Sequence, residues 1–566
     1  MLRPFANFCA LFLVIANVAS GQEASSAKAA GSSTKDTCSI SGLVVKSETN
    51  EPLKKAGVYL RKLDDLRSGY VTHTDATGHF AIERIEPGRY DLRVEHTGYL
   101  SQSYGENSAA NRGAVLSLAT GSKMSDLLFR LVPWAVISGR VTDENGDPFP
   151  NAIVEAMHHF ISEGKRQLGA VERAETNDLG EFRLYGLARG RYLVRARSRD
   201  GRNGNQLSLF VRDEGPTGET GYAPVYYPGT ADVARAAMID VASGQEVPAI
   251  DFTLIPIRTF RVAGHVFDAT LGQAAKECWV FLEHRDSTME RSYSNLEGQA
   301  DCNKGAFLFT DVPPGTYVVI AASMGPNRQR SIGVLVELET ANVGDVALTL
   351  LRGTDLTGNV FVEGREPVDL SELRVWLSET EESLFGGPNT TVKPDGTIII
   401  EHIPVGTFQV EVTGSTPRSL PDFYVKAARL SGEDVLEKGL TIGMGGARGP
   451  MEIIFSSSGA RLEGMVTDES DLPSAGATVA LVPEEARRGQ FRLYKETSTD
   501  QYGKFVIRGI APGKYKLFSW RDVESDSWQD PDFLKPFENQ GTEITAEENG
   551  HLSLTLKVIP TDKPKN

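Results

Sequence analysis

The sequence predicts an all-β protein, with five antiparallel β-sandwich modules in tandem after a secretory signal peptide. Three observations lead to this prediction. The chain is rich in turn residues, with 56 glycines and 28 prolines among 566 residues. Apolar and polar residues alternate over short segments, and helical periodicity is nearly absent. One motif recurs five times, and short strands separated by turns about every 8–12 residues are typical of β-sandwiches.

The composition limits the number of domains and the classes of partner. At roughly 100–200 residues per domain, 566 residues correspond to about three to five domains. The formal net charge of −16, without a basic block, argues against nucleic acid and anionic membranes as partners. The four cysteines include no Cys-x-x-Cys pair, which argues against a zinc ribbon and a thioredoxin-type site.

The first 21 residues have the pattern of a secretory signal peptide. Arg3 supplies the basic start, the stretch 5–18 is apolar, and small residues follow up to Gly21. The apolar run is too short for a comfortable transmembrane helix. Residues 22–37 are rich in Ala, Ser, Gly and Lys and are expected to form a flexible leader. We therefore expect an exported protein, whether periplasmic, at the cell surface or secreted, with no membrane span in the mature chain.

The repeated motif is Gly-x-Phe followed, ten residues after its glycine, by a second glycine with an aromatic residue two positions further on. In the first copy, Asp75 and Gly78 form a turn, and Phe80 and Ile82 then alternate with polar residues in a strand. We expect a positive φ at the turn glycine. The five copies begin at Gly78, Gly180, Gly305, Gly396 and Gly503, and their aromatic residues are Tyr90, Tyr192, Tyr317, Phe408 and Tyr515.

Each copy also has an upstream half that begins with a glycine in an apolar strand. These glycines are Gly42, Gly139, Gly264, Gly358 and Gly464, so the unit repeats every 94 to 125 residues. The predicted modules are module 1 (38–132), module 2 (133–256), module 3 (257–352), module 4 (353–457) and module 5 (458–560), with a tail at 561–566. Because the links are short, we expect a rod of about 150–200 Å, given a radius of gyration of roughly 13 Å per module.

The Gly-x-Phe and Pro-Gly-x-Tyr signature resembles the carboxypeptidase regulatory-like domain, an Ig-like or transthyretin-like sandwich. That superfamily shares its fold with starch-binding and other carbohydrate-binding modules. The resemblance covers residues 38–559 as five copies and implies the topology of each module. Module 4 departs from the signature, because Ile398 and Phe408 replace the usual Phe and Tyr and no proline precedes Gly406.

Motifs of catalysis are missing, so the sequence predicts a protein that is not an enzyme and uses no cofactor or metal. No histidine begins His-x-x-Glu or His-Glu-x-x-His, and no Gly-x-Ser-x-Gly occurs. His158 and His159 are adjacent, and neighbouring strand residues point to opposite faces, so they cannot easily share a metal. Each acidic turn has too few carboxylates for calcium, and we expect the acid to cap its own turn. The recurring acids are Asp75, Asp178, Asp395 and Asp500.

Two of the cysteines fall in one module. Cys278 and Cys302 lie on segments that we expect to be neighbouring strands, and an exported protein permits a disulfide between them. Two buried thiols are the alternative. Cys38 has no obvious partner.

Insertions after the Pro-Gly-x-Tyr strands of modules 2 and 5 hold the candidate ligand-binding residues. Prolines interrupt these segments, so they are not central strands, and we expect their tyrosines and tryptophans to be at least partly exposed. Exposed rings stack on sugars, whose C–H groups meet the negative π-face. The alternative is that the rings pack on their own sandwich or on the next module. The candidates are Tyr222, Tyr226, Tyr227, Trp520, Trp528 and Phe533.

Together these features predict a non-catalytic, exported scaffold or binding protein that contacts cell-surface proteins. The alternative is carbohydrate binding, in which the aromatic loops of modules 2 and 5 hold a polysaccharide. A more distant alternative is an accessory subunit of a peptidase or of an outer-membrane transporter, with the main part of that machine on a separate polypeptide.

Overall fold

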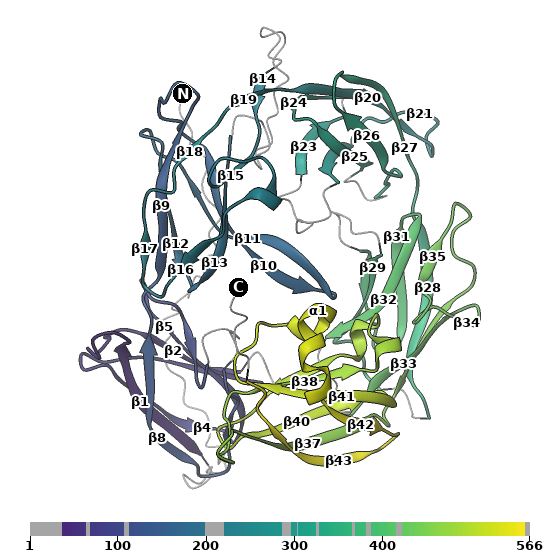
Figure 1. The fold of residues 1–566 in the computed structure, drawn as a ribbon. Coiled ribbons are helices and arrows are strands. Elements are labelled where there is room, and N and C mark those ends of the chain that lie inside the picture. Colours follow the sequence, from purple (N-terminus) through teal and green to yellow (C-terminus); the bar gives the residue numbers. More distant parts are fainter. Residues whose placement is uncertain are drawn as a thin grey trace, which may run out of the picture.

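The computed structural model describes residues 37–63, 68–106, 113–198, 220–285, 296–302, 304–323, 328–364, 368–380, 387–414 and 422–560. The predicted signal peptide (1–21), the leader up to residue 36 and the tail lie outside the described residues. Within these ranges strands dominate, and the predicted all-β sandwich class is confirmed (Figure 1). Module 1 contains β1 (Cys38–Lys46), β2 (Gly57–Lys62), β3 (Gly69–His73), β4 (His79–Ile85), β5 (Gly88–Glu95), β6 (Gln102–Ser103), β7 (Leu116–Leu118) and β8 (Lys123–Leu131).

Module 1 shows the plan that the other modules repeat. Its first sheet has the order β4-β1-β8, in which β1 pairs antiparallel with the Gly-x-Phe strand β4 and parallel with β8. Its second sheet has the order β3-β2-β5, and β6 and β7 extend the free edge of the Pro-Gly-x-Tyr strand β5. The alternating apolar residues of both sheets meet between them and form the module's core.

Modules 2 and 3 keep this plan and add short strands. Module 2 contains β9 (Ala135–Thr142), β10 (Ile153–Ser162), β11 (Lys165–Glu175), β12 (Glu181–Leu187), β13 (Gly190–Arg197), β14 (Thr220–Tyr222), β15 (Val225–Tyr226), the 3-10 turn η1 (Val233–Arg235), β16 (Ile239–Val241), β17 (Glu246–Val247) and β18 (Phe252–Thr253). β19 (Pro256–Arg258) crosses the predicted boundary between modules 2 and 3 and pairs with β14. Module 3 contains β20 (Phe260–Asp268), β21 (Gln273–Ala274), β22 (Trp279–His284), β23 (Leu296–Asp301), β24 (Ala306–Val312), β25 (Gly315–Ala322), β26 (Val334–Leu338) and β27 (Val343–Leu350).

Modules 4 and 5 complete the series. Module 4 contains β28 (Thr354–Val362), β29 (Leu373–Glu379), β30 (Asn389–Thr391), β31 (Thr397–Ile403), β32 (Gly406–Gly414), β33 (Tyr424–Leu430), β34 (Glu433–Asp434), β35 (Leu440–Ile442) and β36 (Met451–Ser456). Module 5 contains β37 (Ala460–Thr467), β38 (Thr478–Pro483), η3 (Glu485–Arg487), η4 (Phe491–Leu493), β39 (Lys495–Ser498), β40 (Lys504–Ile510), β41 (Gly513–Trp520), η5 (Ser527–Gln529), α1 (Pro531–Leu534), η6 (Lys535–Gln540), β42 (Thr542–Ala546) and β43 (His551–Lys557).

The two motif glycines have different physical roles. The turn glycine Gly503 has φ +72°, as expected for a position that disfavours a side chain. The upstream glycine Gly464 lies where the parallel strand β43 crosses closely. A Cβ there would collide with the carbonyl oxygen of Leu554 and would lie 2.9 Å from the ring of Phe505. The upstream glycine Gly464 and the motif phenylalanine Phe505 are therefore far apart in the sequence but in contact in the folded module.

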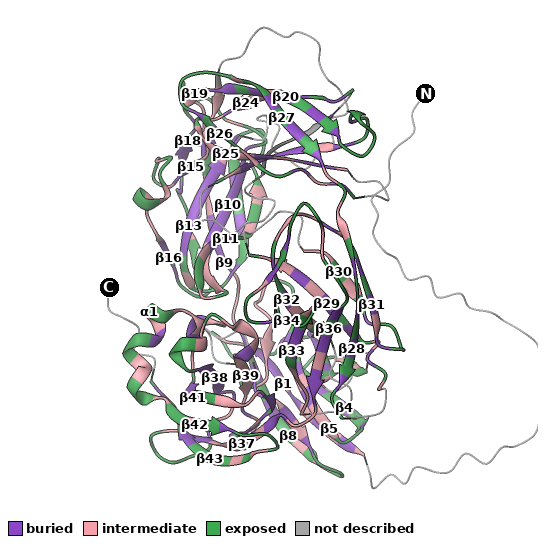
Figure 2. Cartoon of the chain, turned by 90° about the vertical axis from the view of Figure 1, so that its right-hand side faces the viewer, coloured by how far each residue is buried: buried purple, intermediate pink, exposed green. Residues whose placement is uncertain are grey.

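Each module encloses its own apolar core, and buried residues follow the facing sides of the two sheets (Figure 2). The motif rings lie inside these cores: Phe505 and Tyr515, for example, are both buried in module 5. Because each core is complete within its module, the fold of one module does not require side chains from the next.

The five modules close into a ring, so the predicted rod is wrong (Figure 1). Ser117 in module 1 donates its backbone N–H to Oε1 of Gln501 in module 5 at 3.0 Å, and its carbonyl accepts from Nε2 of Gln501 at 2.7 Å. Val115 also forms a parallel bridge with Asp500. These contacts join residues 384 positions apart and bring the last module against the first.

Neighbouring modules are held by polar contacts as well as by the chain. Between modules 3 and 4, both Nη atoms of Arg330 donate to the carboxylate of Glu379, at 2.6 and 2.9 Å. Between modules 4 and 5, Arg508 pairs with Asp422 at 3.5 Å. A forked Arg–carboxylate pair restricts orientation more than a single contact does, so the Arg330–Glu379 pair constrains the angle between modules 3 and 4.

Candidate functional site

The aromatic insertion of module 5 forms a second core on the outer face of its own sandwich. Trp520 ends β41 and stacks on Phe518, with ring centroids 5.3 Å apart and an angle of 5° between the planes. Trp528, in η5, lies against the same indole at 6.2 Å. Phe533 and Phe537 meet Trp520 by their edges, at 5.9 and 5.8 Å. The insertion therefore folds back over the outer face of β38 and β41.

The expected exposure of the module 5 rings is wrong for both tryptophans. Trp520 is 0% exposed and Trp528 is 2% exposed, so neither offers a face to a sugar, and Phe533 is only half-buried. The reason lies in β41, which is apolar on both faces: Tyr515 and Leu517 enter the inner core, whereas Phe518 and Trp520 lie outside it. A sheet with two apolar faces needs a cover. That pattern in the sequence could have predicted the burial.

The cover of module 5 also contains helical turns that the sequence reading did not predict. Asp530 caps α1, with its side chain accepting from the backbone N–H of Asp532 at 2.9 Å. Pro531 follows at the first helical position, where its missing N–H costs nothing. The Asp-Pro-Asp sequence is a local helix-start signal, although the α-helix spans only four residues.

The three candidate tyrosines of module 2 differ in how far they are buried. Tyr226 is buried against the outer face of β10 and β13, with Met157 and Leu193, which contradicts its expected exposure. Tyr222 and Tyr227 are half-buried at the margin of the inner core, as expected for partly exposed rings. The candidates are thus not one patch: Trp520, Trp528 and Tyr226 are buried packing residues, whereas Tyr222, Tyr227 and Phe533 keep accessible surface.

Tyr222 has a polar as well as an aromatic neighbourhood. Its ring meets Phe149 edge-on at 5.0 Å, and its hydroxyl lies 3.5 Å from Oε2 of Glu144. Burial, followed by the negative charges of Glu144 and Asp143, raises the pKa of the Tyr222 phenol. The phenol therefore stays protonated and can donate a hydrogen bond. Tyr227 meets Phe252 at 6.1 Å on the same core.

A buried ion cluster in module 2 was not anticipated from the sequence. Glu155, on β10, is fully buried and accepts from Arg195 at 2.6 and 3.0 Å and from Arg173 at 2.8 and 3.1 Å. Arg197 lies 3.6 Å away. Burial opposes ionisation of Glu155, but the guanidinium charges outweigh it and lower its pKa to about 2. The cluster lies under the insertion, where β10 has an outward carboxylate between apolar residues. In the sequence, the only indication of this ion cluster is that charged residues stand at alternate positions of β13.

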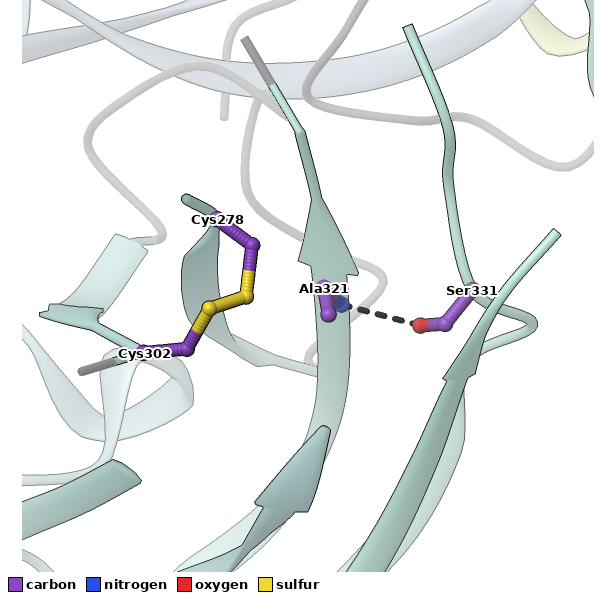
Figure 3. Close-up of a disulfide and its surroundings, with 4 residues drawn as sticks. All are labelled: Cys278, Cys302, Ala321 and Ser331. Atoms are coloured by element: carbon purple, nitrogen blue, oxygen red, sulfur yellow. Dashed lines mark hydrogen bonds between the residues drawn. A yellow bond between two sulfur atoms is a disulfide. The ribbon is translucent and has the colours of Figure 1, made fainter. Parts of the chain in front are cut away.

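The structure joins Cys278 and Cys302 in a disulfide (Figure 3). Their Cα atoms are 5.3 Å apart, within the range that a disulfide spans. Beside it, Ala321 on β25 donates its N–H to Oγ of Ser331 at 2.9 Å. Cys38 is buried as a thiol and donates to the carbonyl of Ala119.

The acidic turns cap themselves. Oδ1 of Asp75 accepts from the backbone N–H groups of Thr77 and His79, at 2.8 and 3.0 Å. In module 2 the cap is Asn177, which accepts from two backbone N–H groups, and not Asp178, so that assignment was wrong by one residue. Asp500 caps its turn as Asp75 does, accepting from the backbone N–H groups of Tyr502 and Lys504, whereas Asp395 stands next to its turn glycine and accepts from the backbone N–H of Thr397 at 3.0 Å.

Two features are absent from the described residues. Among them, no group of three or more His, Cys, Asp or Glu side chains is placed to hold a metal ion. In the same part of the chain, none of the helices has the length and apolar character needed to cross a membrane.

Comparisons with known proteins give one family and several distant structures. A family model of the carboxypeptidase regulatory-like domain matches residues 39–119 and 136–220, in modules 1 and 2, which confirms the predicted tandem domains for these ranges. None of the curated proteins matches the chain.

The solved structures with some likeness include three bacterial proteins. GBS52, the minor pilin of Streptococcus agalactiae, is 10% identical with a TM-score of 0.23 over 39% of this chain and 98% of its own. A streptococcal ancillary pilin is 12% identical, with a TM-score of 0.18 over 56% and 99%. The Bacillus anthracis TIE protein is 11% identical, with a TM-score of 0.15 over 74% and 73%. Scores this low carry no functional information.

Proposed function

We infer that this chain, which carries carboxypeptidase regulatory-like domains in tandem, is an exported, non-catalytic scaffold whose modules present fixed surfaces to partner proteins. The observation that carries the proposal is the closure of the ring by Gln501 and Ser117. A ring of sandwiches sets the distance and orientation between all of its outer surfaces. A chain of independent modules would leave both variable.

The aromatic insertions support the same proposal. Rings that would serve as a ligand platform if exposed are used instead to cover the outer sheet faces of modules 2 and 5. The module 5 cover also contacts module 2, where Arg189 lies 3.7 Å from Asp522. These residues therefore stabilise the assembly. The Cys278–Cys302 disulfide is consistent with export, since disulfides persist in oxidising compartments.

A second function, carbohydrate binding by module 2 alone, is favoured by one observation. Tyr222 and Tyr227 keep exposed surface, and Tyr222 lies beside the carboxylate of Glu144. An aromatic face next to a carboxylate offers both stacking and hydrogen bonding to sugar hydroxyls. This version of the alternative no longer includes module 5, whose tryptophans are buried.

Affinity electrophoresis of the full mature chain separates the two functions. Gels containing soluble neutral or acidic polysaccharides are run with the unmodified protein, with Tyr222→Ala and with the control Tyr185→Ala, an exposed tyrosine elsewhere in module 2. The scaffold proposal expects equal mobility of all three proteins in every gel. Retardation that Tyr222→Ala abolishes and Tyr185→Ala preserves would replace it with carbohydrate binding.

X-ray scattering tests the closed ring on which the scaffold proposal depends. The unmodified chain should be far shorter than the roughly 150–200 Å of five modules end to end. Gln501→Arg removes the paired amide contacts with Ser117 and should increase the radius of gyration, whereas Gln273→Ala, at an exposed position of module 3, should not. A rod-like profile for the unmodified protein would exclude the proposed fixed scaffold.

A further inference from the structure

The last strand of module 5 leaves one edge of its sheet open. Among the described strands β43 pairs only with β37, in the order β40-β37-β43, and it runs along the outer rim of the ring (Figure 1). The N–H of Val558 donates to the carbonyl of Thr467 at 2.9 Å, so alternate residues of β43 turn their backbone groups toward β37. Thr555 and Lys557 lie between these residues and turn their backbone groups to the open edge. Such an edge is a template for another strand.

Module 4 has the same edge with a strand on it. Its β36 pairs parallel with β28 as β43 does with β37, and the registers at the upstream glycines make Met451 the counterpart of Leu554. On its other side β36 pairs antiparallel with β33, in the order β31-β28-β36-β33-β34. The residues of β36 that correspond to Thr555 and Lys557 face β33. The chain therefore already contains an example of a strand added at this edge.

The open edge leaves apolar surface on module 5. Met451 is fully buried in module 4, whereas its counterpart Leu554 is only half-buried. In modules 1 and 3 the counterparts are Leu127 and Val346, and both are buried, so module 5 is the exception among these four. Leu552, two residues before Leu554, is half-buried as well. An added strand that covered these leucines would remove apolar surface from water, which is favourable.

A cavity of about 260 Å³ lies beside this edge, between β41 and the end of β43. Its walls include Leu517, Ser519 and Val558. Ser519 is 1% exposed and, two residues after Leu517 in β41, shares the inward face of that strand. Among the described residues its hydroxyl has no hydrogen-bond partner. Because a buried polar group without a partner is costly, this hydroxyl marks a place where a group of a ligand can bond.

In module 4 an aromatic ring covers the equivalent position. The chain enters β33 from Phe423, whose ring stacks on that of Phe455 with centroids 4.5 Å apart. Phe455 is the counterpart of Val558 in the cavity wall. Val412, which like Ser519 stands four residues after the motif aromatic residue, packs against the same core as Phe423. A large side chain that precedes the added strand thus covers, in module 4, what is a cavity wall in module 5.

We propose that the open edge of β43 binds an extended segment of a partner protein, which adds as an antiparallel strand and places one large side chain in the cavity. This inference rests on the proposed scaffold function and names the kind of partner that one surface of the ring takes. Thr555 and Lys557 hold the segment through backbone hydrogen bonds, which are independent of its sequence. The cavity selects the side chain, and the Ser519 hydroxyl offers it one hydrogen bond.

The strand β33 supplies the probe for a test. A synthetic peptide with the sequence of residues 422–431 contains Phe423 and all of β33. It is titrated into the full mature chain and followed by isothermal calorimetry. The proposal expects saturable binding with one site per chain. The same peptide with alanine in place of Phe423 should bind more weakly, because it leaves the cavity empty.

Two methylated forms of the probe test whether it binds as a strand. In module 4 the carbonyl of Ala428 accepts from the N–H of Val435 on the far side of β33, so the backbone groups of Ala427 and Arg429 face β36. N-methylation of the probe at the positions of Ala427 and Arg429 should weaken binding by about tenfold or more, since the hydrogen bonds to the edge are lost. N-methylation at the positions of Lys426 and Ala428 is the matched control and should leave the affinity nearly unchanged.

Residue-resolved hydrogen exchange locates the bound probe. The amides of Thr555 and Lys557 should become protected, while that of Leu556, which faces β37, should not change. Lys557→Pro removes one N–H of the edge and should abolish binding. Lys557→Met keeps this N–H but loses the pair with Asp471 at 3.0 Å, and it should bind as the unmodified chain does. Tryptophan fluorescence checks the fold of both variants, and the methylated probes give the same test without any change to the protein.

Several results would overturn the proposal. One is the absence of saturable binding, and another is equal affinity of the two methylated probes. Protection confined to β36 would mean that the probe replaces β33 in module 4. A dimer of the unmodified chain in sedimentation, with the amides of Thr555 and Lys557 protected, would assign the edge to a second copy instead of a partner protein. None of these results affects the closed ring, which is tested separately by Gln501→Arg.

Discussion

The hydroxyl of Tyr515 donates a hydrogen bond of 2.8 Å to the carbonyl oxygen of Ala511, four residues earlier in the chain. The ring of Tyr515 is buried in the core of module 5. One residue therefore fills the core and also holds, by its hydrogen bond, the turn that precedes its strand. Module 4 has Phe408 at this position and lacks the hydroxyl. The same bond joins Tyr90 to Glu86, Tyr192 to Ala188 and Tyr317 to Pro313.

Substitution of this tyrosine separates its two roles. Tyr515→Phe keeps the ring and loses the hydrogen bond, so module 5 should lose about 0.5–1.5 kcal/mol of stability. Tyr515→Ala also empties the core and should cost about 3–5 kcal/mol. Urea unfolding followed by tryptophan fluorescence measures both, since Trp520 and Trp528 lie in the same module. The exposed Tyr502→Phe is the control, and equal effects of Tyr502→Phe and Tyr515→Phe would contradict the role of the hydroxyl.

The upstream motif glycine should tolerate no side chain. In Gly464→Ala the new Cβ meets the carbonyl of Leu554 and the ring of Phe505, so strand β43 must shift. Overpacking of this kind costs about 1–3 kcal/mol. Gly489→Ala is a matched control in the same module, because nothing lies within 4 Å of its Cβ position. Thermal unfolding should show a lower melting temperature for Gly464→Ala alone; an unchanged value would mean that β43 adapts without strain.

The buried carboxylate of module 2 should make its stability depend on pH. Because the pKa of Glu155 falls from 4.5 to about 2 on folding, its stabilisation is present above pH 4.5 and is lost as the pH falls toward 2. Glu155→Gln leaves the arginines around it without their buried counter-charge and should cost about 3–5 kcal/mol at pH 7.

Urea unfolding at pH 7 and pH 3, read by hydrogen exchange of β10 and β13, measures this effect. The difference between the unmodified chain and Glu155→Gln should shrink at pH 3. Glu246→Gln, exposed in the same module, should have little effect at either pH. A difference that does not change with pH would show that the charge of Glu155 is not what stabilises β10 against β13.

The disulfide should stabilise module 3 only. It closes a loop between residues 24 positions apart, which corresponds to about 3 kcal/mol in the chain-entropy estimate. In calorimetry of the full chain, only one of the unfolding transitions should move to lower temperature when the disulfide is reduced. The double substitution Cys278→Ser and Cys302→Ser should lower the temperature of the same transition. Cys38→Ser serves as the control for the buried thiol. A shift of every transition would mean that the modules unfold as one unit.

Local patterns were sufficient for the fold of each module. The turn glycine, the capping acid Asp75 three residues before it and the alternation of Phe80 and Ile82 are all short-range features, and the structure shows the corresponding turns and buried faces. The exception at Asn177 is instructive, because Asn and Asp cap a turn equally well and spacing alone cannot choose between neighbours.

The candidate site was harder to predict, because exposure depends on what lies above a ring. Tyr222 and Tyr227 retain accessible surface, whereas Tyr226, only one residue away from Tyr227, turns into the outer core of β10 and β13. Trp520 and Trp528 are buried because the outer face of β41 is apolar and attracts the insertion. Prolines showed correctly that most of these segments are not central strands, but Trp520 is the last residue of β41, which lies between β38 and β42. Prolines also do not reveal which surface the segments cover.

By itself, the sequence determined the module: its strands, its turns, its internal repeat and, for residues 39–119 and 136–220, its match to the carboxypeptidase regulatory-like domain, because all of these follow from short patterns within one module. Only the tertiary structure decided the arrangement of the modules. Gln501 binds the backbone of Ser117 across 384 positions, and the β10–β11 hairpin of module 2 reaches module 5, where His158 lies 3.8 Å from Glu524. Such contacts depend on the angles at every joint between modules, and these small rotations accumulate along the chain without leaving a local pattern in the sequence.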